Sequence, residues 1–383
     1  MTEEVLQKLL QNWFEEFHRN PELSNNEYRT TKRIREILEK LPGVTVRELG
    51  LPTGLYALLN EEAEGPTVAL RADIDALPIT EASGIPYASE NPDVFHACGH
   101  DFHMTALLGA ALRLTENAHQ LPGRILFLFQ PAEEVGNGAE RVIETGLFWR
   151  EGIKCILGLH VEPGIMAGTI GLRKGAFSAS VDWFEILITG QGGHAAHPEK
   201  CLDPIPAAVR LVISLQEIRC RVLDPVRPAV LSVTKVNAGC AYNVIPDMAK
   251  VEGTVRTFRQ EDRSLFQEQI CMRAAFLEAE GYQVKVNWHT SCPPSNNDSE
   301  LIDIIRQTAT ELNIATAPYE MELGGEDFAE YQKIVPGALF QVGMGEKVSA
   351  LHSPAFRAEP RMLGMTSHLL ACVTKRVLEN FSR

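Results

Sequence analysis

Residues 96–103 read His-Ala-Cys-Gly-His-Asp-Phe-His, and this segment constrains the chain more than any other. It offers a thiol and several imidazoles, which are ligands of zinc and other transition metals. Cys98 and His100 are two residues apart and cannot share a helical face, while Gly99 between them lets the backbone bend. Apolar residues at helical spacing follow from Met104 to Leu112. The pattern predicts a ligand-bearing loop at a helix N-terminus, whose dipole favours a thiolate. The alternative is a buried cysteine beside surface histidines.

Three short apolar runs are typical of strands buried on both faces, and each leads into polar residues. The runs with the residues that follow them are 68–70 with Asp73 and Asp75, 125–129 with Glu133 and Glu134, and 155–159 with His160. Helical patterns alternate with these runs, so the expected fold class is α/β with a mostly parallel sheet. Ligands of open α/β sheets collect beyond the carboxyl ends of the strands. We therefore expect these side chains at one edge of the sheet.

Glu133 and Glu134 form an adjacent pair of carboxylates. Their charges repel each other, and a bound metal ion relieves the repulsion. One carboxylate can then bind the metal while the other takes a proton from water, which is the division of roles in metal-assisted hydrolysis. Taken alone, such a pair is more typical of an exposed acidic loop. Pro131, Gly136 and Gly138 around it instead indicate a shaped loop that a ligand can approach.

The pattern along the chain changes near residue 180, and 383 residues are too many for one ordinary core. From residue 183 to 288 the expected order is β-α-β-β-α-β, which fits a ferredoxin-like sandwich. We expect this inserted domain at 180–291, between the two pieces, 1–179 and 292–383, of a discontinuous catalytic domain. The second piece carries His352, a ligand candidate that in isolation is typical of an ordinary loop histidine.

Composition excludes several classes of partner. The net charge of −14 argues against nucleic acid or an anionic membrane. No stretch approaches the ~18 uncharged apolar residues of a membrane span, and the N-terminus lacks the features of a signal peptide. The eight cysteines are scattered without a C-x-x-C pair or a disulfide framework. Reduced thiols and a cytoplasmic location are therefore expected.

The motifs together resemble a known superfamily along nearly the whole chain. The matching segments are His18–Leu23, Arg71–Pro78, His96–Asp101, Gln130–Glu134, Gly192–Ala196, Asn243–Pro246, Gly253–Arg256, Glu326–Phe328 and Leu351–Pro354. In these segments the chain resembles the di-metal amidohydrolases of the aminoacylase and metallo-carboxypeptidase superfamily. It is most similar to the branch of hippurate hydrolases, N-acetyldiaminopimelate deacetylases and auxin-conjugate hydrolases.

This resemblance implies two divalent metal ions per subunit, of Mn²⁺, Zn²⁺, Ni²⁺ or Co²⁺. The implied ligands are Cys98, His100, Glu134, His160 and His352. Cys98 would bridge the two ions, and Glu133 would be the general base. Asp73 or Asp75 would orient a ligand, and their spacing leaves the choice between them open because both point to one side of an extended segment.

The resemblance also implies roles outside the ligand set. His194 would help to hold the scissile carbonyl, and Asn243 and Arg256 would face the substrate, with Arg256 suited to a carboxylate. His96 and His103 are not carried over as ligands and are expected to be structural. The inserted domain would serve as a lid and in dimerisation, giving a homodimer or a homotetramer.

The activity implied by the resemblance is hydrolysis of the amide bond of an N-acyl amino acid to a carboxylate and a free amino acid. The substrate is then the only small-molecule partner expected. A dipeptidase or metallo-carboxypeptidase would use the same metals and base. Two further alternatives are a metal-binding protein without catalysis and an enzyme with Cys98 as nucleophile; retention of Glu133 beside Glu134 argues against the first.

Overall fold

The computed structural model describes residues 2–382, which divide into two compact units. Unit 1 contains residues 2–175, 296–320 and 327–382, and unit 2 contains residues 176–295 and 321–326. Backbone hydrogen bonds of Glu322 with Phe177 and Ala179 tie the short segment 321–326 into unit 2. The catalytic and lid roles expected for the two domains remain predictions.

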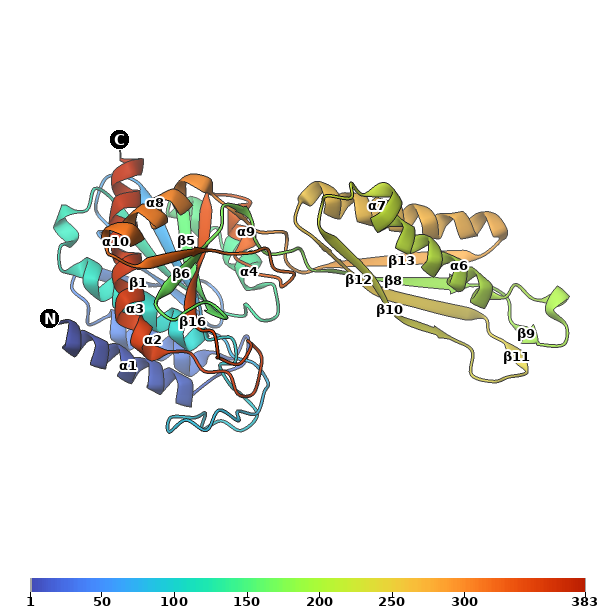
Figure 1. Cartoon of the computed structure of the whole chain (residues 1–383), viewed down its shortest axis with the longest axis horizontal. Coiled ribbons are helices and arrows are strands. Elements are labelled where there is room, and N and C mark those ends of the chain that lie inside the picture. Colours follow the sequence, from blue (N-terminus) through green and yellow to red (C-terminus); the bar gives the residue numbers. More distant parts are fainter. Residues whose placement is uncertain (1, 383) are drawn as a thin grey trace. The chain divides into compact units, whose positions relative to one another are not determined.

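A mixed eight-stranded sheet forms the centre of unit 1 (Figure 1). Its strands, in spatial order, are β1 (Val44–Glu48), β2 (Leu55–Leu59), β4 (Arg124–Gln130), β3 (Thr67–Asp73), β5 (Ile153–Pro163), β16 (Gly337–Gly345), β6 (Thr169–Leu172) and β15 (Ala315–Pro318). The central strands β4, β3, β5 and β16 are parallel to one another, whereas β2 pairs antiparallel with β1 and β4. The predicted α/β class with a largely parallel sheet is confirmed. The antiparallel strands β1 and β2 were not predicted.

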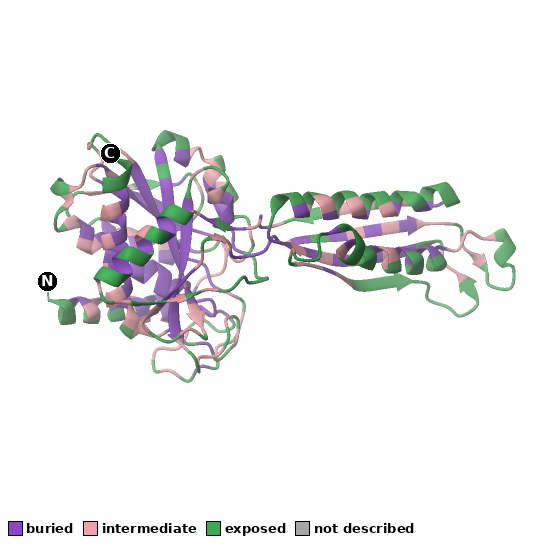
Figure 2. Cartoon of the chain, turned by 45° about the horizontal axis from the view of Figure 1, so that its top comes forward, coloured by how far each residue is buried: buried purple, intermediate pink, exposed green. Residues whose placement is uncertain are grey.

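Helices cover the sheet of unit 1, and its inner strands β2, β4, β3 and β16 are almost wholly buried, whereas the edge strands β1 and β15 are not (Figure 2). The helical segments are α1 (Glu3–Arg19), α2 (Tyr28–Leu38), α3 (His100–Thr115), η1 (Ala118–Gln120), α4 (Gly138–Glu144), α5 (Leu147–Arg150), α8 (Ser299–Glu311), α9 (Ala329–Gln332), η5 (Pro360–Met362) and α10 (Leu363–Phe381). Helix α3 packs between the sheet and α10, which explains why its residues from 100 to 111 are all buried. No helix within residues 2–382 is both long and apolar enough to cross a membrane.

Unit 2 is an antiparallel sheet with two helices on one face. Its sheet order is β10-β12-β8-β13, and its core contains side chains of α6 and α7. The main elements are β8 (Asp182–Thr189), α6 (Pro204–Glu217), β10 (Ala229–Ala238), β12 (Met248–Thr257), α7 (Gln260–Ala275) and β13 (Gln283–Thr290). Its shorter elements are β9 (Gly193–His194), η2 (Pro198–Lys200), η3 (Ile218–Val222), β11 (Val244–Ile245) and η4 (Phe276–Glu280). The short strand β14 (Asn296–Asn297) belongs to unit 1, and β7 (Gly175–Ala176) lies where the chain passes from unit 1 into unit 2. The chain order of the main elements agrees with the expected ferredoxin-like sandwich.

A buried histidine at the end of α1, His18, contacts two acidic side chains elsewhere in unit 1. Nδ1 of His18 lies 2.6 Å from a carboxylate oxygen of Asp101, and its Nε2 lies 3.2 Å from one of Glu81. Burial by itself lowers the pKa of His18, but the two carboxylates outweigh burial and raise that pKa to about 9. His18 is therefore an imidazolium at neutral pH, held between two anions.

This cluster predicts a loss of stability at alkaline pH. The raised pKa means that the imidazolium of His18 contributes fully below about pH 6.5, and that its contribution disappears as the pH rises to about 9. The free energy of unfolding should fall by ~3 kcal/mol across this window. Denaturant unfolding of chelator-treated protein at several pH values measures it. The His18→Gln variant should show a much flatter profile, and equal slopes in both proteins would contradict the assignment.

Candidate metal centre

Three parallel strands direct acidic and imidazole side chains to one edge of the sheet in unit 1. Strand β3 ends at Asp73, β4 is followed by Glu133 and Glu134, and β5 carries His160. The apolar run before His160 predicted that the strand ends there. Instead β5 continues to Pro163, because its backbone keeps pairing with β16 beyond His160.

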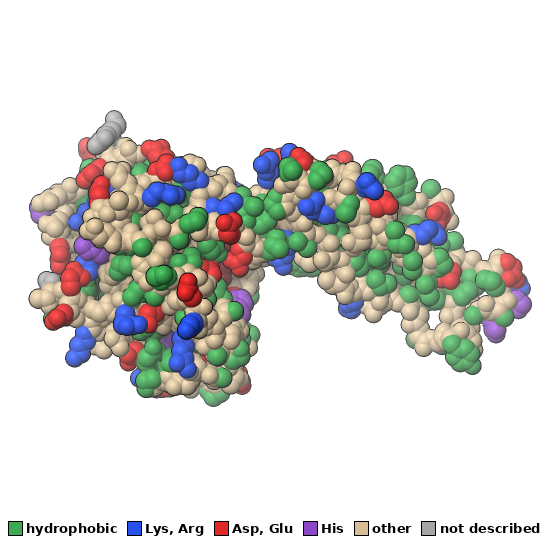
Figure 3. Space-filling model, in the orientation of Figure 1, with side chains coloured by type: hydrophobic (Ala, Val, Ile, Leu, Met, Phe, Trp, Pro, Cys, Tyr) green, Lys and Arg blue, Asp and Glu red, His purple; other side chains and the backbone are tan. Residues whose placement is uncertain are grey.

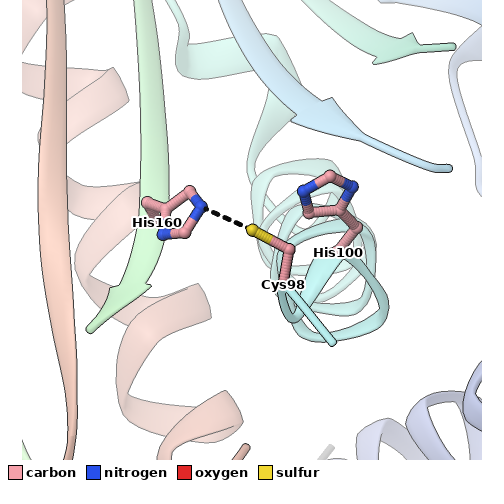
Figure 4. Close-up of side chains that lie close together, drawn as sticks. All are labelled: Cys98, His100 and His160. Atoms are coloured by element: carbon pink, nitrogen blue, oxygen red, sulfur yellow. Dashed lines mark hydrogen bonds between the residues drawn. The ribbon is translucent and has the colours of Figure 1, made fainter. Parts of the chain in front are cut away.

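The Cys-Gly-His segment forms a tight bend at the start of α3. Gly99 has a φ of +80°, and a Cβ atom on it would lie 2.5 Å from Cγ2 of Val161, so a side chain there would be strained and would clash. The bend brings the Cys98 sulfur to 3.5 Å from Nε2 of His160 on β5 (Figure 4). Helix α3 begins at His100, four residues before the start of the apolar periodicity at Met104.

His100 presents one ring nitrogen to the centre of this cluster. Its Nδ1 lies 2.9 Å from the backbone oxygen of Asp75, which fixes the ring. Its Nε2 lies 3.7 Å from Oε1 of Glu134. Both of these buried atoms lack a hydrogen-bond partner among the described residues. A metal ion would satisfy both, because neutral imidazole and carboxylate are ligands of divalent transition metals.

All the predicted ligands come together in unit 1. Three of the groups whose ligand atoms lie within 4.8 Å of one another consist of predicted ligands and Glu133: Cys98, His100 and His160; Cys98, Glu134 and His352; and His100, Glu133 and Glu134. Asp73, His100 and His103 form a further group. His352 is the most exposed of them, and its backbone adopts a φ of +62° while its N–H donates to the oxygen of Ala97. Such a conformation is unusual for a residue other than glycine and is typical of functional sites. These groups are candidates for holding metal ions, and the role of each residue as a ligand remains a prediction.

Without a metal ion, the surroundings of Cys98 and Glu134 oppose ionisation of both side chains. Burial and then the charge of Glu134 raise the pKa of the Cys98 thiol well above its ordinary value, which opposes formation of the thiolate by the protein groups alone. Burial also raises the pKa of Glu134. A divalent cation would reverse both shifts, because thiolate and carboxylate are the forms that bind metal. The donor set therefore fits a metal ion and disfavours Cys98 as a metal-free nucleophile.

Asp73 and Asp75 occupy different positions, which the sequence could not separate. Asp75 touches His100 directly, with its Oδ1 3.3 Å from Nδ1, and its other oxygen accepts hydrogen bonds from Ser24 and from the N–H of Glu134. Asp73 instead contacts His103, whose Nδ1 lies 2.7 Å from its Oδ1. Burial opposes ionisation of both aspartates, but their imidazole neighbours lower both pKa values. Asp75 is thus the residue beside Nδ1 of His100, whereas Asp73 hydrogen-bonds to His103 and lies 3.8 Å from Nε2 of His100.

The three predicted residues of unit 2 do not form one cluster within that unit. His194 and Asn243 are exposed neighbours, because β9 and β11 pair and the N–H of Ala195 donates to the oxygen of Asn243. Arg256 lies near the opposite end of β12 from β11, eight residues beyond Met248. At the usual rise of a strand this is roughly 25 Å along β12. Their predicted roles remain open.

A buried polar network behind the centre was not predicted. Arg71 donates to Asp73, Gln130 and Asp327, and all four side chains are buried. The only signal in the sequence is an arginine inside an otherwise apolar strand, since a buried arginine needs several acceptors. Asp327, 256 residues away, could not be assigned to it from local pattern.

A model of peptidase family M20/M25/M40 matches residues 69–375. This chain belongs to that family. The predicted resemblance, and the prediction that the chain is a metallo-hydrolase-type enzyme, are thereby confirmed. Among its M20 relatives is N-acetyl-L-cysteine deacetylase of Bacillus subtilis (strain 168), 42% identical over 95% of this chain and 86% of the relative. Another is thermostable carboxypeptidase 2 of Saccharolobus solfataricus, 35% identical over 93% of this chain and 92% of the relative.

Solved structures of the family have the same fold. The YXEP protein of Bacillus subtilis, described as a dinuclear metal binding peptidase from the M20 family, matches with a TM-score of 0.88. It is 37% identical, and the match covers 99% of both chains. Dinuclear metal binding therefore occurs in an M20 structure of closely similar fold, and this chain has candidate metal-binding groups of its own.

Proposed function

We propose that this M20 protein is a two-metal amidohydrolase that cleaves N-acyl amino acids, with N-acetyl amino acids as the first class to test. The observation that carries this proposal is the convergence of Glu133 and Glu134 with Cys98, His100, His160 and His352. A carboxylate that can take a proton from water, placed beside a set of metal ligands, is the requirement of metal-assisted hydrolysis. The name of the 42% identical deacetylase supports the substrate class.

In the proposed mechanism, two bound ions of Mn²⁺, Zn²⁺, Ni²⁺ or Co²⁺ supply Lewis-acid activation of water and of the acyl oxygen. Cys98, His100, Glu134, His160 and His352 would hold them. Glu133 accepts the proton of the attacking water and returns it to the leaving amine. Asp75 holds the His100 ring so that Nε2 faces the centre.

Residues of unit 2 are proposed to bind the substrate. His194 would donate to the oxyanion, Asn243 would contact the amide, and Arg256 would pair with the substrate carboxylate. Arg256 is distant from His194 within unit 2. Both residues could therefore contact one substrate molecule only if they came from different subunits of the proposed homodimer. Variants of Asn243 and Arg256 should raise KM, and variants of His194 should lower kcat, while the metal content stays that of the wild type. Steady-state kinetics and elemental analysis measure these effects separately.

A carboxypeptidase or dipeptidase acting on small peptides is the second candidate, favoured by the carboxypeptidase relative. Both substrate classes carry a free carboxylate, so the acyl group distinguishes them. We expect hydrolysis of N-acetylcysteine and N-acetylmethionine at a kcat/KM at least tenfold above that for glycylmethionine, a difference of about 1.4 kcal/mol. Assays with manganese, nickel, cobalt and zinc in turn measure this. A preference for the dipeptide would favour the second candidate.

A homodimer formed through unit 2 is proposed, with a tetramer as the alternative. Ile205, Val209 and Ile213 are exposed at four-residue spacing along α6, and Val236 is exposed on the edge strand β10. Figure 3 shows hydrophobic side chains at the surface of this unit. Such faces are typical of association sites. Light scattering after size exclusion measures the mass, and a monomer would contradict the proposal.

A cytoplasmic location is also proposed. The eight cysteines are scattered without the spacing of a disulfide framework, which favours a reducing compartment.

A further inference from the structure

His103 lies behind the candidate metal centre and uses both of its ring nitrogens. Its Nδ1 lies 2.7 Å from Oδ1 of Asp73, and its Nε2 accepts the backbone N–H of Val161 at 2.9 Å. A nitrogen that accepts from an N–H carries no proton, so the ring is neutral with its proton on Nδ1. His103 is completely buried. It therefore has no ring nitrogen left to bind a metal, although its ring is close to those of His100 and His160.

Asp73 is itself held rigidly. Its second oxygen accepts from Nη1 of Arg71 at 2.6 Å, and Arg71 also donates to Gln130 and Asp327. Arg71 and Asp73 are 2% and 0% exposed. The guanidinium of Arg71 thus connects the ends of β3 and β4 with Asp327. Because Asp73 is held in place by Arg71, its contact with His103 fixes the position of the His103 ring.

Val161 is the point at which this network meets the ligands. Strand β3 pairs with β5 only as far as Gly158, so the N–H of Val161 is satisfied by His103 rather than by β3. The backbone oxygen of Val161 accepts from Nδ1 of His160 at 2.7 Å, which leaves Nε2 of His160 facing the Cys98 sulfur. The side chain of Val161 also fills the space against Gly99, beside Cys98. The position of Val161 therefore sets both the tautomer of His160 and its distance from Cys98.

We propose that His103 is a positioning residue that fixes Val161, and that it thereby sets the affinity of the ion held between Cys98 and His160. This inference rests on the proposed two-metal function, because it assigns His103 to one of the two ions. The proposal predicts that loss of His103 weakens binding of this ion and leaves binding of the second ion unchanged. A residue with a general structural role would lower both affinities alike.

Two amide variants separate the two bonds of His103. Asparagine can reach Asp73 but not the N–H of Val161, whereas the oxygen of glutamine can occupy the position of Nε2. We expect His103→Asn to weaken one of two Co²⁺ binding steps by about 10- to 100-fold and to leave the other unchanged. His103→Gln should stay within a few-fold of wild type in both. Calorimetric titration of the metal-free protein with Co²⁺ measures the steps, and the sulfur-to-cobalt absorption band reports on Cys98.

The matched control is His96→Asn, which removes another buried imidazole from the same segment. It should leave both steps unchanged, and an effect equal to that of His103→Asn would overturn the proposal. Equal loss in the Asn and Gln variants would also overturn it. If His103→Asn does not fold, Asp73→Asn serves instead, because it weakens the anchor of His103 without altering Val161; an unchanged Co²⁺ affinity would then refute the inference. Failure of the wild type to bind two ions would instead refute the proposed function.

Discussion

Replacing Glu133 with glutamine is expected to lower kcat by about 10³-fold while both metal ions remain bound. Glutamine keeps the size of the side chain but cannot accept the proton of the attacking water. The ligand candidate beside it, Glu134, is untouched and keeps its positions near His100 and His352. Steady-state kinetics with N-acetylmethionine and elemental analysis of the same sample measure the two halves of this expectation.

The matched control for that variant is Glu140→Gln. Glu140 is exposed in the first turn of α4, shortly after the same loop, and belongs to none of the ligand groups. Its variant should retain wild-type kcat. Near-normal turnover in Glu133→Gln with intact metal would show that another group is the base. Loss of metal from that variant would show that Glu133 is a ligand instead.

Replacing Cys98 with alanine should reduce the metal content from two ions to about one or fewer per chain and abolish most activity. Cys98 belongs to one group with His100 and His160 and to another with Glu134 and His352, as expected of a residue that would bridge two ions. Elemental analysis after dialysis measures the remaining metal.

Cys155→Ala is the control for loss of a buried thiol. Cys155 is fully buried in β5 within the hydrophobic core and belongs to no ligand group. This variant should lose some stability but keep both ions. Chelation of the wild type adds an independent test, since it should remove the activity that added metal restores. Activity that survives chelation would instead support Cys98 as a nucleophile.

Much of the site was predictable because the local sequence of short segments specifies their conformation. The apolar runs before Asp73 and Glu133 are strands, and strands that run parallel end at the same edge. The Cys98–His100 segment is a bend because Gly99 has a positive φ and no room for a side chain. These features depend on the local backbone conformation and on burial of both faces of a sheet. Both can be predicted from the residue types in a short segment and from their spacing.

Other features depended on contacts that local pattern does not contain. The choice between Asp73 and Asp75 follows from which of His103 and His100 each one meets across the fold. The β3 arginine has its partner Asp327 far along the chain.

The sequence alone therefore indicated the candidate donor residues, the positions of Asp73 and of the Glu133–Glu134 pair after apolar strands, the α/β class and the family. Only the tertiary structure decided that His352 meets Glu134, that Asp75 lies beside Nδ1 of His100 while Asp73 hydrogen-bonds to His103, and that His103 accepts the N–H of Val161. The physical reason is that spacing specifies the conformation of a short segment, whereas the order of strands in a sheet is set by packing of the whole chain. Strand β16 lies beside β5 although nearly two hundred residues separate them, and no local periodicity encodes that pairing.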